Sequence, residues 1–183
     1  MIKTARIASL AAAAVATIGL AFSPVASAKG PKGPTIVDVA IAINADGPFA
    51  GQFDTLIAAV TSADPIVLDT LQGNGKLTVF APTDDAFAAI GLTPANVGSL
   101  PTDFLTQVLV YHVARGERTA ADVVPAERIR MLGGGFLYKE AGSTTLVDNL
   151  GRPANIIVTD VKAANGVIHA IDAVVLPAPP PAP

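Results

Sequence analysis

The feature that most constrains the fold is the run 167–176, which is apolar on both of its alternating faces apart from His169 and Asp172. A strand of this composition is typical of a sheet interior that is covered on both sides. A hairpin this apolar is not stable alone in water. We therefore predict that the rest of the chain packs around this strand.

The pair Asn165-Gly166, directly before this run, is a strong signal for a β-hairpin. Both positions of a type I′ turn need a positive φ, which Asn and Gly tolerate. We expect residues 156–163 to pair back onto 167–176. A turn centred on Asn165-Gly166 also sets the register. It pairs Ile157 with Val174, Thr159 with Asp172, Asp160 with Ile171, Val161 with Ala170, and Lys162 with His169.

Length and composition limit the class of protein. With 183 residues, 51% of them hydrophobic, the chain can form one domain with a sizeable core. It contains no cysteine, which excludes disulfides and thiolate chemistry. Its formal net charge of −3 disfavours nucleic acid as a partner. Four arginines alternate with Glu117 and Glu127, and we interpret them as a solvated face. They are Arg115, Arg118, Arg128 and Arg130.

The two ends of the chain differ in composition from its middle. Residues 1–28 have the pattern of a secretory signal peptide, with Lys3 and Arg6 before an apolar run and Ala26-Ser27-Ala28 at its end. Residues 29–34 form a flexible lead-in, residues 35–177 the domain, and residues 178–183 a Pro-rich extended tail. We expect no transmembrane segment after cleavage of the signal. The periplasmic or extracellular destination stays open.

Helix signals dominate the first half of the domain and strand signals the second half, which is typical of an α+β fold. Caps at Thr35, Asp64 and Thr83 mark three helix starts. Helical periodicity predicts helices near 53–60, 66–72 and 103–113, and places His112 near the core. Alternation and turn residues predict strands at 77–80, 135–140 and 144–147.

Three segments together resemble the signatures of the fasciclin domain family. They are 77–87, the pair Tyr111-His112, and 165–177, and they occur in the family order. The residues that carry the resemblance are Thr83, Asp84, Phe87, His112, Asn165, Gly166, His169 and Asp172. The resemblance implies an α+β wedge in which an N-terminal helical layer packs on a β-sandwich. It also implies a secreted or surface-attached adhesion module whose partners are cell-surface or matrix macromolecules.

The same resemblance suggests binding residues. Members that bind integrins use in part an Asp-Ile pair just before the last signature, and this chain has Asp160-Val161 there. Tyr111 and His112 are the other candidates for binding. The resemblance implies an adhesive role for this chain, but it does not imply that the partner is an integrin.

The residues give no sign of an enzyme, a metal or a cofactor. The two histidines, His112 and His169, have no ligand partners at metal-binding spacing. We expect two half-buried imidazoles, each hydrogen-bonded to a carboxylate or a carbonyl. Ser143 does not lie in a Gly-x-Ser-x-Gly motif, and no activated nucleophile is evident.

A second class of function stays open. The domain is unusually aliphatic, with only 5% aromatic residues. A cleft between the helical layer and the sheet would suit an apolar small molecule such as a carotenoid or a lipid, and some fasciclin-like proteins resemble such carriers. The alternative is that the aliphatic side chains simply fill the core. The oligomeric state is not indicated by the sequence.

Overall fold

The computed structural model describes residues 30–139 and 142–177; the predicted signal peptide and the Pro-rich tail lie outside these residues. Their strands form a seven-stranded sheet with the order β2-β1-β7-β6-β5-β4-β3. The strands are β1 (Leu77–Pro82), β2 (Val113–Arg115), β3 (Arg128–Arg130), β4 (Phe136–Lys139), β5 (Thr145–Val147), β6 (Pro153–Ala163) and β7 (Gly166–Ile171).

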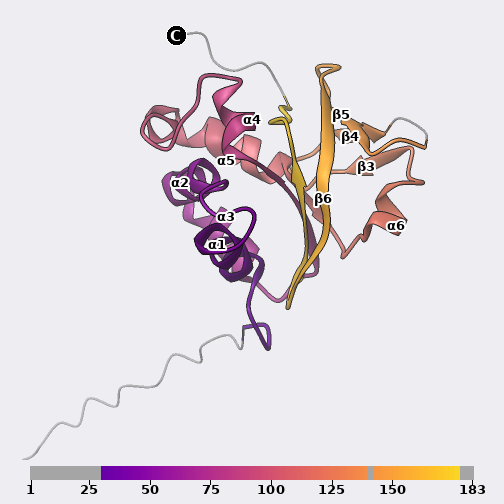
Figure 1. Ribbon diagram of the computed structural model, residues 1–183, viewed down its shortest axis with the longest axis horizontal. Coiled ribbons are helices and arrows are strands. Elements are labelled where there is room, and N and C mark those ends of the chain that lie inside the picture. Colours follow the sequence, from indigo (N-terminus) through magenta and orange to yellow (C-terminus); the bar gives the residue numbers. More distant parts are fainter. Residues whose placement is uncertain (1–29, 140–141, 178–183) are drawn as a thin grey trace, which may run out of the picture.

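Helices cover one side of the part of the sheet formed by β1, β7 and β6, and β5, β4 and β3 lie on its other side (Figure 1). The helical layer contains α1 (Ile36–Ala45), α2 (Asp54–Ser62), α3 (Pro65–Gln72), α4 (Asp84–Ala88), the 3₁₀ turn η1 (Val97–Ser99) and α5 (Thr102–Tyr111). The short helix α6 (Ala120–Val123) lies beside β3 to β5. The two edges of the sheet meet at a bridge between Ala114 of β2 and Met131, the residue directly after β3, so the sheet curls into a sandwich. The predicted α+β wedge is confirmed.

The predicted helix starts are correct, because the caps form as expected. Thr35 and Asp38 make a reciprocal capping box at α1. The Asp64 carboxylate accepts a hydrogen bond from the N–H of Ile66, with Pro65 at the first helical position. Thr83 caps α4 by accepting from the N–H of Ala86. These local bonds fix where the helical layer begins.

Strand β7 separates two apolar cores. Ile168 and Ala170 belong to the core between the sheet and the helices. Ile171 belongs to the second core, inside the sandwich. β7 pairs with β1 in parallel and with β6 in antiparallel orientation, so it is an interior strand as predicted. It ends at Ile171, earlier than expected, although residues 174–176 are also buried.

The predicted hairpin register is wrong. Ala163 pairs with Gly166 and Val161 with Ile168, so the two turn residues are Ala164 and Asn165. Further along, the register shifts twice, and Ile171 faces Ile156 instead of Asp160. The other predicted pairs, Ile157–Val174, Thr159–Asp172, Val161–Ala170 and Lys162–His169, are absent from the observed ladder.

The different turn is caused by contacts of Asn165 and Gly166 with residues far away in the sequence. The buried Asn165 amide accepts from the N–H of Ile36 and donates to the carbonyls of Leu71 and Gly73, at 2.7 to 2.9 Å. Gly166 runs so close to Leu77 that a Cβ would collide with the Leu77 carbonyl oxygen. Asn165 therefore anchors the hairpin to the helices, and Gly166 allows the close approach to β1.

This packing gives a stability prediction with a matched control. We expect Ile171→Asp to destabilise the fold by more than about 4 kcal/mol, because an unpaired carboxylate would enter the sandwich core. Ile157→Asp places the same side chain on β6 at a position that is 48% exposed, and should change stability by no more than about 1 kcal/mol. Urea denaturation of both variants measures the difference. Equal midpoints would contradict the assignment of β7 to the interior.

Candidate functional site

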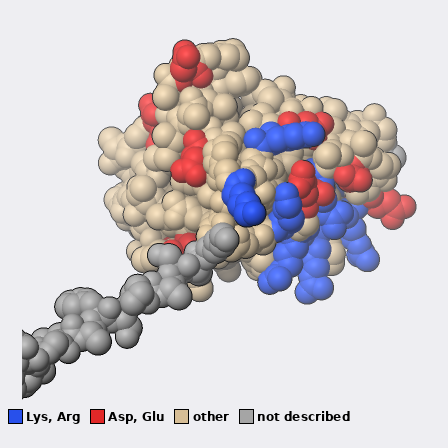
Figure 2. Space-filling model, turned by 90° about the horizontal axis from the view of Figure 1, so that it is seen from below, with Lys and Arg blue, Asp and Glu red and all other residues tan. Residues whose placement is uncertain are grey.

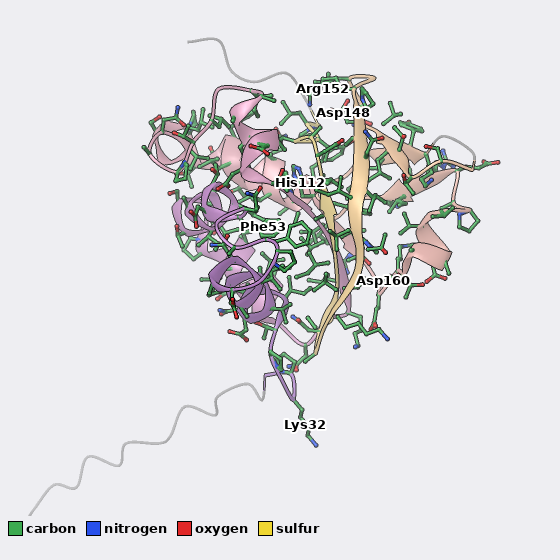
Figure 3. All side chains as sticks on the ribbon, viewed as in Figure 1. Lys32, Phe53, His112, Asp148, Arg152 and Asp160 are labelled. Carbon is green, nitrogen blue, oxygen red and sulfur yellow. The ribbon has the colours of Figure 1, made fainter. Side chains whose placement is uncertain are left out.

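The imidazole of His112 lies between the helical layer and the sheet (Figure 3). It caps the end of α5 and is almost completely buried. Its Nδ1–H donates to the carbonyl of Val108 at 2.8 Å, and its Nε2 accepts from the N–H of Val175 at 3.3 Å. These bonds define a neutral ring with its proton on Nδ1. Burial lowers the pKa of His112 to about 4.

An ion pair with a buried carboxylate lies near this ring. The Asp148 carboxylate accepts from Nη2 and Nε of Arg152 at 2.6 and 2.9 Å, and from the N–H of Leu176 at 3.0 Å. Burial by itself would raise the pKa of Asp148, but the Arg152 guanidinium and the backbone N–H donors outweigh it and lower the pKa. Together, His112 and Asp148 hold residues 174–176 against the domain.

Two apolar clefts meet at His112. One, with a volume of about 200 Å³, is enclosed by α2, α4, α5 and residues 174–176. The other, of about 250 Å³, lies between helices α1 to α3 and strand β1. Leu56, Leu109 and His112 line both clefts. Because His112 is neutral, the shared wall carries no charge.

Tyr111 and His112 point to opposite sides of the chain. Tyr111 is completely buried in the sandwich core. Its hydroxyl donates to the carbonyl of Phe136 at 2.7 Å and accepts from the N–H of Asn149 at 3.3 Å. Burial raises the pKa of Tyr111 to about 12. Tyr111 is thus inaccessible to a macromolecular partner, and His112 is accessible only through the clefts.

Asp160 and Val161 lie at the irregular part of β6. Among the described residues, Asp160 is the only non-glycine residue with a positive φ, at 62°. Its N–H donates to Nδ1 of His169 at 3.2 Å, and its carboxylate accepts from the N–H of Ala120 at 2.8 Å. Val161 packs partly buried against the helical core. Asp160 therefore joins β6, β7 and α6, and this role uses both its backbone and its side chain.

His169 completes this junction. Its Nε2–H donates to the carbonyl of Arg118 at 2.9 Å, and its ring stacks on Phe80 with centroids 5.6 Å apart. Both histidines donate to backbone carbonyls, and within residues 30–139 and 142–177 neither bonds a carboxylate. The two rings are fully buried, whereas the sequence suggested half-buried rings. The expectation of a carbonyl partner is confirmed.

The remaining motif residues connect elements of the fold. Asp84 accepts from the N–H of Thr55 at 2.8 Å, so it caps α2 from α4. Phe87 is buried in the helical core. Asp172 accepts from the backbone N–H and the side-chain amide of Asn155, at 2.7 and 2.9 Å. Thr83, Asn165 and Gly166 have the capping, anchoring and close-contact roles described above.

Sequence reasoning missed the Asp148–Arg152 pair. The available signal was an acid and an arginine four residues apart, with Asn149, Leu150 and Gly151 between them. Within residues 30–139 and 142–177, no three His, Cys, Asp or Glu side chains gather as a metal site would need. The same part of the chain has no helix that is both long and apolar enough to span a membrane.

These features agree with comparisons to known proteins. The sequence model of the fasciclin domain matches residues 51–177, and the chain belongs to the fasciclin family. Protein sll1483 of Synechocystis sp. is 42% identical over 127 residues, which cover 68% of this chain and 67% of that protein. Immunogenic protein MPB70 of Mycobacterium bovis is 31% identical over 188 residues, covering 92% and 94%.

A solved structure shares the fold. It is the FAS1 domain pair from the insect cell adhesion molecule Fasciclin I, with a TM-score of 0.51 and 21% sequence identity. The match covers 68% of this chain and 45% of that one. The helical layer and curled sheet described above are therefore the fasciclin fold.

The buried His112 predicts a dependence of stability on pH. Its folded pKa of about 4 lies below the ordinary 6.5, so the unfolded chain binds more protons between these values. Stability is therefore fully present above pH 6.5 and falls by up to about 3 kcal/mol as the pH drops to 4. Urea titrations across this range measure the slope. The variant His112→Gln should lose the part of this slope that comes from His112. An unchanged slope in the variant would show that His112 is not its cause.

Proposed function

We propose that the protein is a secreted or cell-surface module that binds other macromolecules through its outer surface and catalyses no reaction. The observation that carries this is that the residues best suited to chemistry are used inside the fold. His112, His169 and Asp148 are buried and hydrogen-bonded to backbone groups or to Arg152. Fasciclin domains are generally adhesion-type modules without enzymatic activity, and one relative, MPB83 of Mycobacterium bovis, is named a cell surface glycolipoprotein.

We assign the module to residues 35–177. The helix α1 supports a start before residue 51, where the family match begins, because Ile36 is buried and bonds Asn165. In this proposal residues 1–28 direct export, residues 29–34 are a lead-in, and the Pro-rich tail is a spacer. Binding at a surface gains strength when many copies act together.

Attachment of the host cell tests the adhesion role. We expect a strain lacking the protein to attach to cells and surfaces less well than its parent, and the full chain to restore attachment. Complementation with Ile157→Asp, which keeps the fold, should also restore it, whereas Ile171→Asp should not. Unchanged attachment in the deletion strain would contradict the proposal.

The two clefts favour a second candidate function, the transport or storage of an apolar small molecule. Their volumes of about 200 and 250 Å³ together approach the size of common ligand sites. Their walls are mainly apolar, and the neutral His112 lies where they meet. An elongated hydrocarbon, such as a carotenoid or a lipid, suits this shape and polarity.

Extraction of the protein from its native host tests the carrier role. We expect organic solvent to release a stoichiometric pigment or lipid, detected by absorbance and mass spectrometry. Ala40→Phe narrows the second cleft from α1 and should reduce the bound amount. Ala42→Phe, on the exposed side of the same helix, is the matched control. A clean extract from the unaltered protein would contradict this function.

A further inference from the structure

The outer face of β3 and β4 combines arginine and aromatic side chains. The register pairs Arg128 with Tyr138 and Arg130 with Phe136. The residues between them, Ile129 and Leu137, are buried in the sandwich core. Because successive side chains of a strand alternate between faces, the two pairs point outward.

A third arginine extends this surface onto β2. Ala114 and Met131 form an antiparallel bridge, and both are buried inside the sandwich. Arg115 and Arg130, one residue along from this bridge, are both exposed, and continuing its antiparallel register places them opposite each other. Figure 2 shows Lys and Arg side chains gathered on one part of the surface, with a few acidic residues beside them. We call the set Arg115, Arg128, Arg130, Phe136 and Tyr138 the arginine–aromatic face.

The cations of this face have no acidic partner among the described residues. The two salt bridges within the described residues do not involve the face: they join Lys76 to Glu117 and Arg152 to Asp148. Like charges on neighbouring strands destabilise a sheet, and a bound anion would relieve the repulsion. Two acidic residues are close to these arginines in the sequence. Glu117 is already paired with Lys76, and Glu127 lies just before β3.

The aromatic rings of this face contact one of its arginines and each other. The Arg128 guanidinium lies 4.7 Å from the centre of the Phe136 ring, a cation–π contact. Phe136 and Tyr138 are tilted against each other with centroids 6.3 Å apart, and Tyr138 is 45% exposed. Two rings beside planar guanidinium groups form a surface that offers both flat apolar contacts and fixed hydrogen-bond donors.

We propose that the arginine–aromatic face binds an acidic polysaccharide. Guanidinium groups make bidentate hydrogen bonds to carboxylate or sulfate groups, and the rings offer flat contacts for the sugar faces between them. This inference rests on the proposed function, because an exported adhesion module meets such polymers at cell surfaces. A single-stranded nucleic acid uses similar contacts. The exported location in the proposed function favours the polysaccharide, and an oligonucleotide probe distinguishes the two.

Binding of the full chain to defined polymers tests the proposal. The probes are polygalacturonate, dextran sulfate, neutral dextran and a single-stranded oligonucleotide, measured by biolayer interferometry. We expect binding to one or both acidic polymers, weakening as salt is raised, and none to neutral dextran. Equal binding to neutral dextran, tighter binding to the oligonucleotide, or no binding at all would overturn the proposal.

Two double variants distinguish a specific role of the arginine–aromatic face from a general effect of net charge. The double variant Arg128→Ala/Arg130→Ala should weaken binding to the acidic polymer about tenfold or more. Lys32→Ala/Lys162→Ala removes the same charge at other exposed sites and should change it less than about twofold. Arg128→Lys should weaken binding although it keeps the charge. Equal loss in both double variants would overturn the assignment to this face.

The attachment assay distinguishes this proposal from the adhesion role. If attachment depends on the protein but survives Arg128→Ala/Arg130→Ala, the adhesion role stands and the arginine–aromatic face is not its basis. If the deletion strain attaches normally, the adhesion role fails whatever the polymer measurements give. Urea midpoints equal to that of the unaltered protein would show that the double variants are folded.

Discussion

Burial of β7 on both faces is the constraint on which the rest of the structure depends. Ile168 and Ala170 need the helical layer, and Ile171 needs the second half of the sandwich. Neither half covers the strand by itself. Parallel pairing of β7 with β1 requires a long connection between these two strands. That connection contains α4, α5 and the segment from β2 to β6. The two cores are therefore built together around one strand.

Buried polar side chains determine how these layers are joined. Asn165 connects the hairpin turn to the start of α1 and the end of α3. His112 and Asp148 bind the backbone of residues 174–176, and His169 links β7 to the segment before α6. A buried polar group without a partner is costly, so each of these bonds selects one arrangement of distant segments. The family signatures thus mark positions that join layers.

Local signals explain how much of this could be predicted from sequence. The caps at Thr35, Asp64 and Thr83 act within four residues, so they were correctly placed. The hairpin register was not, because Asn165 is satisfied by helices that lie about 90 to 130 residues earlier. Strands β2 and β3 and helix α6 have three or four residues, too few for a periodicity to appear. The role of Asp148 likewise depends on Leu176, which no spacing rule relates to it.

The same architecture separates the two surfaces that could bind partners. The clefts belong to the helical core and share His112, whose neutral ring keeps their wall apolar. Most of the arginine–aromatic face lies on β3 and β4, which cover the sandwich core from the other layer, and none of its five residues lines a cleft. Sites without shared residues or common partners are expected to act independently. A small apolar molecule inside the helical layer and an acidic polymer outside the sandwich are thus compatible on one domain, and loss of either leaves the fold that supports the other.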